Sequence, residues 1–178
     1  MDTSDGYEGL DFGLADPGLI EDTRIAEEAA RQGVDPVEAA MADPLREFDA
    51  RRDCAAPAAG CLVRVSTEGA DEVAGLVART RMLERLKSAV RAPDLCLAID
   101  GGEIVLALTN CDVEGARKRV GLMLKLIEMD PELGGLQASL WAGIAPVDRD
   151  SMLAMRTARL ACDLAAFHAP GHIEVVDL

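Results

Sequence analysis

The sequence predicts an α+β protein, with an antiparallel sheet that carries packed helices and short helices in front of it. Short apolar runs typical of strands alternate with longer segments whose apolar residues recur at helical spacing. An Asp-Gly pair at 100–101 separates two of the apolar runs, which indicates a β-hairpin because glycine tolerates the positive φ of a tight turn. Acidic residues and Asp-Pro pairs dominate the first third of the chain instead.

The acidic first third is predicted to form an arm in front of the sheet domain. Residues 1–53 hold 15 acidic and 5 basic side chains, so they carry −10 of the total charge of −14. Residues 1–15 are expected to be a disordered acidic tail, and 16–59 an acidic helical arm and linker. The arm either packs on its own domain or on its twin in a homodimer, or it docks on another protein. Asp-Pro pairs suit helix starts, and they predict helices at about 17–32, 36–42 and 44–53.

Residues 60–178 are predicted to form the globular domain, in the order β-α-β-β-α-β-α-β. The first six elements have the ferredoxin-like order, an antiparallel sheet that nucleotide-cyclase and polymerase palms share with many unrelated proteins. The expected strands cover 61–65, 95–99, 104–108, 137–144 and 172–176, and the expected helices cover 70–90, 113–129 and 149–168. The first of these helices is expected to have one broad apolar face, made by Val73, Leu76, Val77, Met82, Leu83, Leu86 and Val90.

Composition excludes several classes of function. The negative charge and the single Trp, single Tyr and three Phe argue against binding to nucleic acid. No apolar run reaches the roughly 18 residues that a membrane helix needs, so no membrane insertion is expected. Five cysteines without a CxxC pair argue against a disulfide framework or a zinc site, and they predict a cytoplasmic location.

Two short motifs lie close together in the middle of the chain. Arg91-Ala92-Pro93-Asp94 ends a predicted helix, and Asp100-Gly101-Gly102-Glu103-Ile104 follows after five residues in the predicted hairpin. Their order and spacing resemble the RxxD motif and the signature hairpin of GGDEF (diguanylate-cyclase-like) domains. The segment Cys111–Glu114 is similar to the start of the family's next helix, and Leu140–Ala145 and Leu164–Val175 are similar to its later elements. The resemblance covers about two-thirds of the chain and implies a nucleotide-cyclase palm.

The positions that the resemblance assigns to metal and phosphate have changed. The family's metal-binding Asp-x-Asp pattern falls on Arg64-Val65-Ser66, where a cation and a hydroxyl replace hard oxygen ligands. In the alignment without gaps, Gly102 replaces an acid, Asp100 replaces the first glycine, and only Glu103 keeps its acidic identity. A shift of one residue would restore Gly101-Gly102-Glu103, but it would lengthen the spacing from the RxxD motif by one and place Ile104 at the second acid. The sequence therefore predicts a degenerate signature without catalytic residues and without bound metal.

Two further parts of the family's active site differ in this sequence. The loop that should bind guanine is several residues short at 67–71. In the closing helix, Ala165 stands where the family has a tyrosine, and His168 stands where it has a phosphate-contacting lysine. We therefore expect a protein that is not an enzyme and that needs no cofactor.

The RxxD motif has two interpretations. The resemblance implies an inhibitory site that binds cyclic di-GMP, in which Arg91 pairs with phosphate and guanine and Asp94 pairs with the guanine edge. The alternative is a simple helix end, with an arginine near the carbonyl dipole and a Pro-Asp turn. Ala98 replaces one supporting arginine, and Arg117 and Arg119 are expected on a different face.

The two histidines of the chain are not expected to bind metal together. His168 and His172 are four residues apart, but Pro170-Gly171 between them should break the helix that would align them.

The predicted function is a non-catalytic adaptor or scaffold in bacterial signalling related to cyclic di-GMP, with another signalling protein as partner. The alternative is a receptor that binds cyclic di-GMP as a regulatory ligand at Arg91 and Asp94. Residual diguanylate cyclase activity is the third hypothesis.

Overall fold

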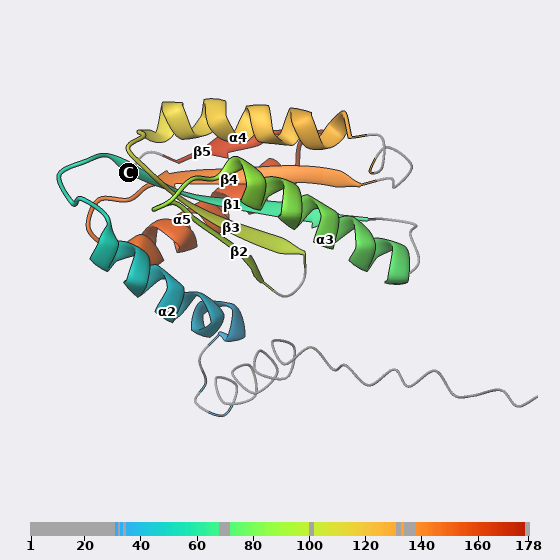
Figure 1. Ribbon diagram of the computed structural model, residues 1–178. Helices are drawn as coiled ribbons and strands as arrows, with labels where there is room; N and C mark the ends of the chain where they lie inside the picture. Colours follow the sequence, from blue (N-terminus) through green and yellow to red (C-terminus); the bar gives the residue numbers. More distant parts are fainter. Residues whose placement is uncertain are drawn as a thin grey trace, which may run out of the picture.

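The computed structural model describes residues 31, 33, 35–67, 72–99, 102–130, 133 and 138–176. Within them the helices are α2 (Pro36–Arg51), α3 (Glu72–Ala89), α4 (Val113–Glu128) and α5 (Ser151–Ala165). The strands are β1 (Ala58–Ser66), β2 (Leu95–Ile99), β3 (Glu103–Thr109), β4 (Ser139–Pro146) and β5 (Ile173–Val175) (Figure 1). No helix in this part of the chain has the length and apolar character needed to cross a membrane.

The sheet has the order β2-β3-β1-β4-β5. Its first four strands are antiparallel neighbours, which confirms the ferredoxin-like arrangement. The sheet as a whole is mixed rather than antiparallel, because β5 pairs in parallel with β4. A parallel neighbour needs a crossover connection, and α5 supplies it between these two strands.

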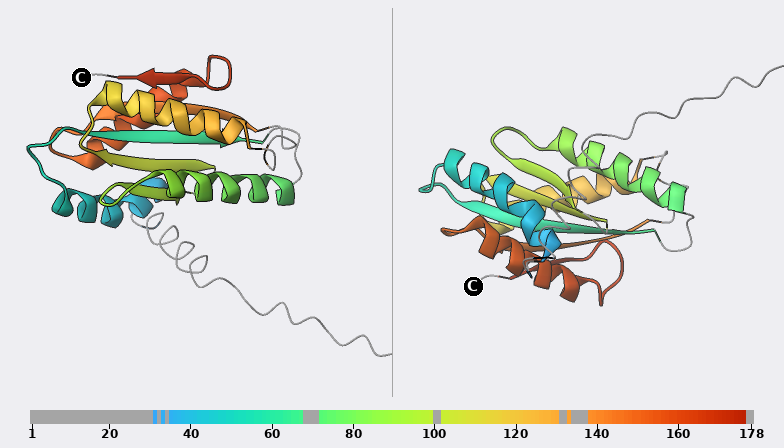
Figure 2. Two further views of the ribbon diagram at one scale, coloured as in Figure 1. Left: turned by 45° about the horizontal axis from the view of Figure 1, so that its top comes forward. Right: turned by 90° about the horizontal axis from the view of Figure 1, so that it is seen from below.

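Strand β1 separates two apolar layers by the alternation of its side chains. Cys61, Val63 and Val65 belong to the layer under α3 and α4. Ala58 and Leu62 belong to the layer that α2 and α5 cover on the other face. Figure 2 shows α4 and α2 on opposite sides of the sheet and, from below, α2 beside α5.

The expected apolar face of α3 is only partly buried. Met82 and Leu86 are buried in the layer under α3 and α4, as predicted. Val73, Leu76 and Val77 are exposed instead. The prediction was wrong for these three residues because the buried stripe of α3 runs along Gly75, Ala78, Met82 and Leu86, which leaves Val73, Leu76 and Val77 off that stripe.

The arm segment before the domain contains one helix where the sequence suggested two. Asp35 caps α2, accepting a hydrogen bond of 2.9 Å from the Val37 amide, and the helix continues through Pro44. The prediction of separate helices at 36–42 and 44–53 is therefore wrong. A proline inside a helix removes one backbone hydrogen bond, but the buried side chains of α2 lie at helical spacing on both sides of it and hold the turns together: Met41, Leu45 and Phe48.

The remaining N-terminal predictions concern other residues. The tail at 1–15 and nearly all of the helix expected at 17–32 lie outside the described residues. Strand β1 begins at Ala58, a few residues before the predicted start at 61.

The crossing of β4 and α5 leaves no room for a side chain at Gly143. A Cβ atom added there would overlap the carbonyl oxygen of Ala158 and the amide nitrogen of Cys162. We predict that Gly143→Ala lowers the free energy of unfolding by about 3 kcal/mol or more, because neither backbone atom can move away cheaply. Urea unfolding followed by circular dichroism measures this.

Gly121→Ala is the matched control. Its added Cβ would lie 3.5 Å from Ile173 Cδ1, an ordinary contact, and alanine stabilises the interior of α4 by up to about 1 kcal/mol relative to glycine. Equal stability of the two variants would contradict the close crossing.

Candidate ligand-binding site

Three chain segments meet beside the RxxD motif. Helix α3 ends at Ala89, and the turn that follows closes with a hydrogen bond of 2.6 Å from the Asp94 amide to the Arg91 carbonyl oxygen. Strand β3 ends at Thr109, and α4 begins nearby, capped by Asp112 through a hydrogen bond of 2.7 Å from the Gly115 amide. Side chains from two helix ends and one strand end are thereby brought to one place.

The Asp94 carboxylate joins these segments. It is only 4% exposed, and its Oδ1 accepts hydrogen bonds of 2.8 Å from both the amide and the hydroxyl of Thr109. Its Oδ2 accepts a hydrogen bond of 2.7 Å from Nη2 of Arg119. Burial alone would raise the pKa of Asp94, but the hydrogen bonds from Thr109 and Arg119 hold it below its ordinary value.

Arg119 lies at this site, although the sequence placed it on a different face. It is i+3 from Ala116 and i−4 from Met123, two buried residues of α4, so it sits at the edge of the buried face. The sequence could have revealed this phase, because the apolar spacing of α4 fixes which residues border its core. Its guanidinium has five N–H donors, and Asp94 and the Cys111 sulfur engage only some of them.

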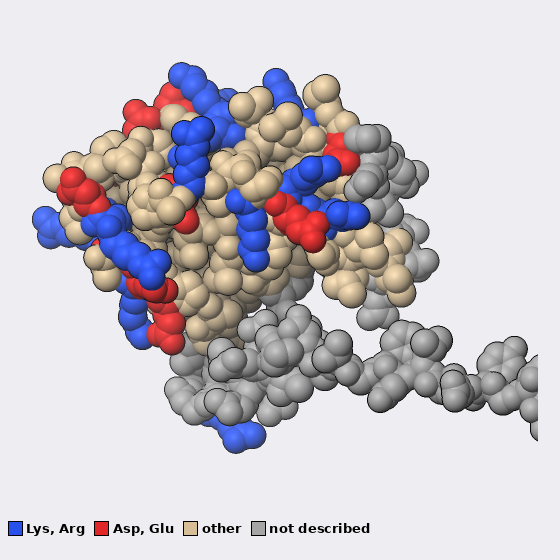
Figure 3. Space-filling model, in the orientation of Figure 1, with Lys and Arg blue, Asp and Glu red and all other residues tan. Residues whose placement is uncertain are grey.

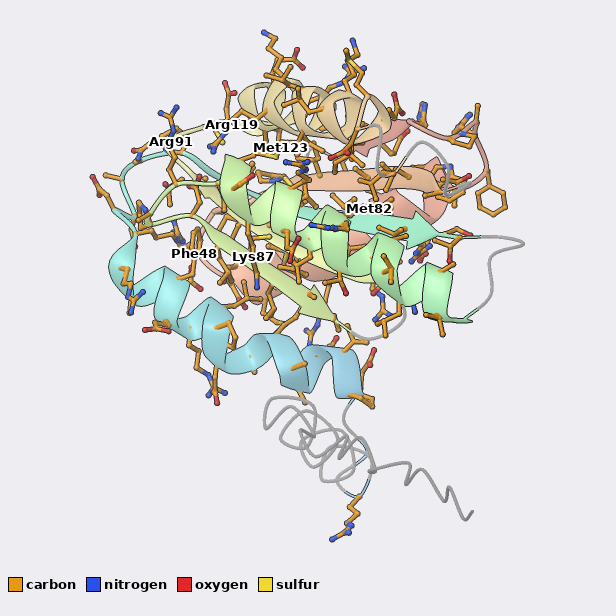
Figure 4. All side chains as sticks on the ribbon, turned by 45° about the vertical axis from the view of Figure 1, so that its right-hand side comes forward. Phe48, Met82, Lys87, Arg91, Arg119 and Met123 are labelled. Atoms are coloured by element: carbon orange, nitrogen blue, oxygen red, sulfur yellow. The ribbon has the colours of Figure 1, made fainter. Side chains whose placement is uncertain are left out.

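Arg91 lines the same pocket as Arg119. The pocket has a volume of about 450 Å³, and Arg91, Asp94, Thr109, Asn110 and Arg119 are among its lining residues. Figure 4 shows Arg91 and Arg119 close together at one end of the domain. Within the described part of the chain, no carboxylate pairs with the Arg91 side chain. Two guanidinium groups at one opening favour an anionic ligand, because each can hold a phosphate through paired hydrogen bonds.

The predicted signature hairpin is present between β2 and β3. Ile99 pairs with Glu103 across it, and Ile104 is buried in the layer under α3 and α4. Asp100 and Gly101 lie outside the described residues. Gly102 has a φ of +83°, and a Cβ atom there would lie 2.7 Å from the Val65 carbonyl oxygen. This glycine therefore lets the hairpin approach β1 closely.

The acid that the signature retains is enclosed by arginines. Glu103 has a side chain only 7% exposed, and its Oε1 accepts a hydrogen bond of 2.7 Å from Nη2 of Arg64. Its Oε2 lies 3.5 Å from Nε of Arg159, an ion pair without hydrogen-bond geometry. Arg64 also pairs with Asp163 at 2.7 Å, and Arg159 pairs with Asp35 at 3.0 Å. These ion pairs connect β1, β3, α5 and the residue that caps α2.

A second pocket lies beside the hairpin and has a different character. Its volume is about 300 Å³, and most of its lining side chains are apolar, including Leu76, Leu83 and Ile104. Arg79 and Glu103 add charge to its lining. Glu103 is paired with Arg64, so Arg79 is the one arginine lining this pocket that could bind an anion. The pocket at the RxxD motif is lined by two, Arg91 and Arg119.

The structure brings the two histidines together, contrary to the prediction. The ring centroids of His168 and His172 are 4.2 Å apart. Helix α5 ends at Ala165, a few residues before the end predicted at 168, so Pro170-Gly171 does not end it. Gly171 has a φ of +86° and returns the chain toward His168. Ala165, which stands where the family has a tyrosine, is fully buried in the core.

Solved structures of cyclase domains match this fold. No family model and no curated protein matches the sequence. The GGEEF domain of a diguanylate cyclase from Vibrio cholerae superposes with a TM-score of 0.62, over 74% of this chain and 92% of the other, at 15% identity. The chain has a GGDEF-like fold.

Two further GGDEF structures show the same likeness. The GGDEF domain of DgcB from Caulobacter crescentus, solved in complex with c-di-GMP, gives a TM-score of 0.65 over 78% of this chain and 89% of the other, at 9% identity. The diguanylate cyclase SiaD from Pseudomonas aeruginosa, solved with its activator SiaC, gives 0.66 over 89% and 67%, at 15% identity. At these identities the likeness establishes the fold of the chain, so its chemistry has to be argued from its own residues.

The lowered pKa of Asp94 leads to a pH-dependent prediction. A carboxyl whose pKa is lower in the folded state stabilises the fold above its unfolded pKa of about 3.9, and this stabilisation is lost as the pH falls through the folded pKa. We predict that Asp94→Asn destabilises the protein at pH 7 and that its stability difference from the wild type shrinks below about pH 4. Urea unfolding at pH 7 and at about pH 3 measures both.

Asp148→Asn, at an exposed position, controls for the change in net charge. A stability difference for Asp94→Asn that stays constant or grows in acid would show that the carboxylate is not held as described.

Proposed function

We propose that this protein is a non-catalytic GGDEF-like signalling protein that binds cyclic di-GMP in the pocket between Arg91 and Arg119. The observation that carries the proposal is the presence of two arginines, from separate segments, around one pocket at the RxxD motif. The sequence alone favoured an adaptor over a receptor partly because no supporting arginine was evident. The position of Arg119 supplies one and favours the receptor.

The charge and size of the pocket suit this ligand. Cyclic di-GMP carries two phosphodiester anions, and Arg91 and Arg119 can bind phosphate oxygens bidentately. A volume of about 450 Å³ falls in the range of small-molecule sites. Arg91 is exposed and can turn toward a ligand, whereas Arg119 is 32% exposed and anchored by Asp94. One arginine is preorganised and the other is adaptable.

Asp94 has a different role here from the one that the resemblance implies. Both of its oxygens already accept hydrogen bonds from Thr109 or Arg119. A direct contact with a guanine edge would cost part of this arrangement. We therefore assign Asp94 as a positioning residue that orients Arg119, and the ligand contacts to the two arginines.

The ion pairs of Arg64 support the absence of catalysis. Two-metal phosphoryl transfer needs carboxylates that converge on divalent cations. At the place where the resemblance expects this site, the guanidinium of Arg64 already neutralises Glu103 and Asp163. A second cation beside Arg64 would be repelled, and Glu103 would have to give up its partner.

Calorimetry with cyclic di-GMP tests the receptor function. We predict saturable binding by the full chain, and about tenfold or greater loss of affinity in both Arg91→Ala and Arg119→Ala, because each variant removes a charge-assisted contact. Arg117→Ala is the control, since Arg117 lies on the same helix and pairs with Glu114 outside the pocket. No heat at tens of micromolar ligand, or equal binding by all three variants, would overturn the proposal.

Incubation with GTP tests the absence of catalysis. We predict no cyclic di-GMP and no pyrophosphate release by the purified chain with Mg²⁺ or Mn²⁺, because Arg64 occupies the cation position. Arg64→Asp alone should remain inactive, since Gly102 leaves the signature one carboxylate short. Product formation by the wild-type chain, measured by chromatography, would contradict this part of the proposal without affecting the binding site.

An adaptor role is the second candidate, and it is compatible with the first. A receptor without catalytic output has to act through another protein. Among the described residues, large apolar side chains are exposed on α3, α4 and α5, for example Leu76, Leu126 and Leu160. Charged side chains are interspersed over the face that Figure 3 shows, rather than gathered by sign. The signalling partner, a homodimer and the bacterial cytoplasm stay predictions.

A further inference from the structure

The turn between α5 and β5 gathers three side chains of metal-binding type. His168 follows the end of α5, His172 precedes β5, and Glu174 lies on β5, paired with Gly143 of β4. The two imidazole rings are tilted by 31° at a centroid distance of 4.2 Å. Nε2 of His172 lies 3.2 Å from Oε2 of Glu174. Each of the three residues offers one ligand atom, and these atoms lie within 4.8 Å of one another.

Strand β4 fixes the backbone that carries these side chains. The Trp141 indole N–H donates a hydrogen bond of 3.1 Å to the His168 carbonyl oxygen, and the Ala142 amide donates one of 3.1 Å to the His172 carbonyl oxygen. The Gly171 amide donates one of 2.7 Å to the Leu140 carbonyl oxygen. Three consecutive residues of one strand therefore hold both histidine backbones, so the cluster is part of the fold and not an encounter of loose side chains.

We infer that His168, His172 and Glu174 form a binding site for a divalent transition-metal ion of the Zn²⁺ or Ni²⁺ class. Two imidazoles with one carboxylate bind ions of this class in preference to Mg²⁺ or Ca²⁺, which prefer ligand sets made only of oxygen. Around a tetrahedral ion with metal–ligand distances of about 2.0–2.2 Å, the ligand atoms lie roughly 3.3 Å apart. The present spacing is somewhat wider, and rotation of the side chains closes the difference, because His168 is exposed and the other two are about one-third exposed.

The surrounding charge favours a cation at the turn. Glu128 approaches from α4, so that a Cβ atom added to Gly171 would lie 3.3 Å from its Oε1. Glu174 contributes a second carboxylate, and its ligand oxygen lies within 4.8 Å of a nitrogen of each imidazole. Three protein ligands leave room for water in the fourth position of the ion. The site shares no residue with the pocket at Arg91 and Arg119.

Trp141 provides a built-in probe for the experiment, because it is the only tryptophan of the chain and its indole bonds to the His168 carbonyl oxygen. Ni²⁺ is titrated into the untagged full chain while the emission of Trp141 is followed. The expected result is saturable quenching with one ion per chain, reversed when Zn²⁺ displaces Ni²⁺. Quenching that does not saturate, or one ion per two chains, would overturn the single-chain site.

Variants locate the ion. His168→Gln and His172→Gln should each weaken Ni²⁺ binding about tenfold or more, and Glu174→Gln by several-fold. Glu128→Gln is the control for charge without ligation and should change the midpoint by less than about threefold. Unchanged midpoints in both histidine variants would exclude the site.

A measurement on the wild-type chain keeps the test independent of the variants. The chain has two histidines, so its proton spectrum contains two sets of imidazole signals. Addition of one equivalent of Zn²⁺ should shift both sets together. A shift of one set alone, or of neither, would show that the two rings do not share an ion.

Discussion

The fold depends on β1, the central strand of the sheet, which pairs antiparallel with β3 on one edge and with β4 on the other and contributes side chains to both apolar layers. It pairs with β3 from Ala58 to Arg64 and with β4 from Ala59 to Ser66. Its side chains alternate between the two apolar layers, so each layer is fixed in place by the same strand. Displacing β1 by one residue would move each buried side chain to the wrong layer. The register of β1 therefore determines where every other element can pack.

The same register places the two candidate regions at opposite ends of β1. Ala58 pairs with Thr109, whose amide and hydroxyl bind Asp94 and thereby the Arg119 side of the ligand pocket. Arg64 lies near the other end and pairs with both Glu103 and Trp141 on its neighbours. One end of the strand thus carries the proposed anion pocket, and the other carries the signature hairpin and the histidine turn.

The charges at the two ends are satisfied in different ways. At the signature end, Glu103 and Arg64 use each other and their partners on α5, which offsets the cost of burying them but leaves little capacity for a ligand. At the other end, Asp94 offsets the charge of Arg119 but leaves some of its N–H donors free, because a guanidinium has more donors than one carboxylate oxygen can accept. Arg91 adds a charge that no carboxylate of the described residues offsets. This difference in charge pairing is why we propose the ligand site at the RxxD end of the strand.

The sequence predicted the features that depend on local periodicity and failed where tertiary packing decided. The hairpin, the strands and the helix start at Asp35-Pro36 follow from short patterns, and the structure contains them. The sequence predicted two helices, one on either side of Pro44, but the structure has one continuous helix. The side chains that α2 buries on both sides of Pro44 pack on a sheet formed by later residues, and no local pattern shows that packing. Leu76 is exposed because the small residues Gly75 and Ala78 carry the buried stripe through the first half of α3, and a face defined by large apolar side chains misses that stripe.

The site residues were harder to predict for a related reason. Arg91 and Asp94 were found because they lie together in one short motif. Arg119 reaches the same site only because the start of α4 at its cap, Asp112, and the helical repeat place it on the side of the helix that faces Asp94. The histidines show the opposite error: breaking a helix was taken to separate His168 from His172, yet the positive φ of Gly171 and the hydrogen bonds to β4 bring the rings into contact. A turn that follows a helix can return its flanking residues to one place when a neighbouring strand holds both sides of it. Proximity across Pro170-Gly171 is thus decided by Leu140, Trp141 and Ala142, which lie about 30 residues away and which no local pattern connects to the turn.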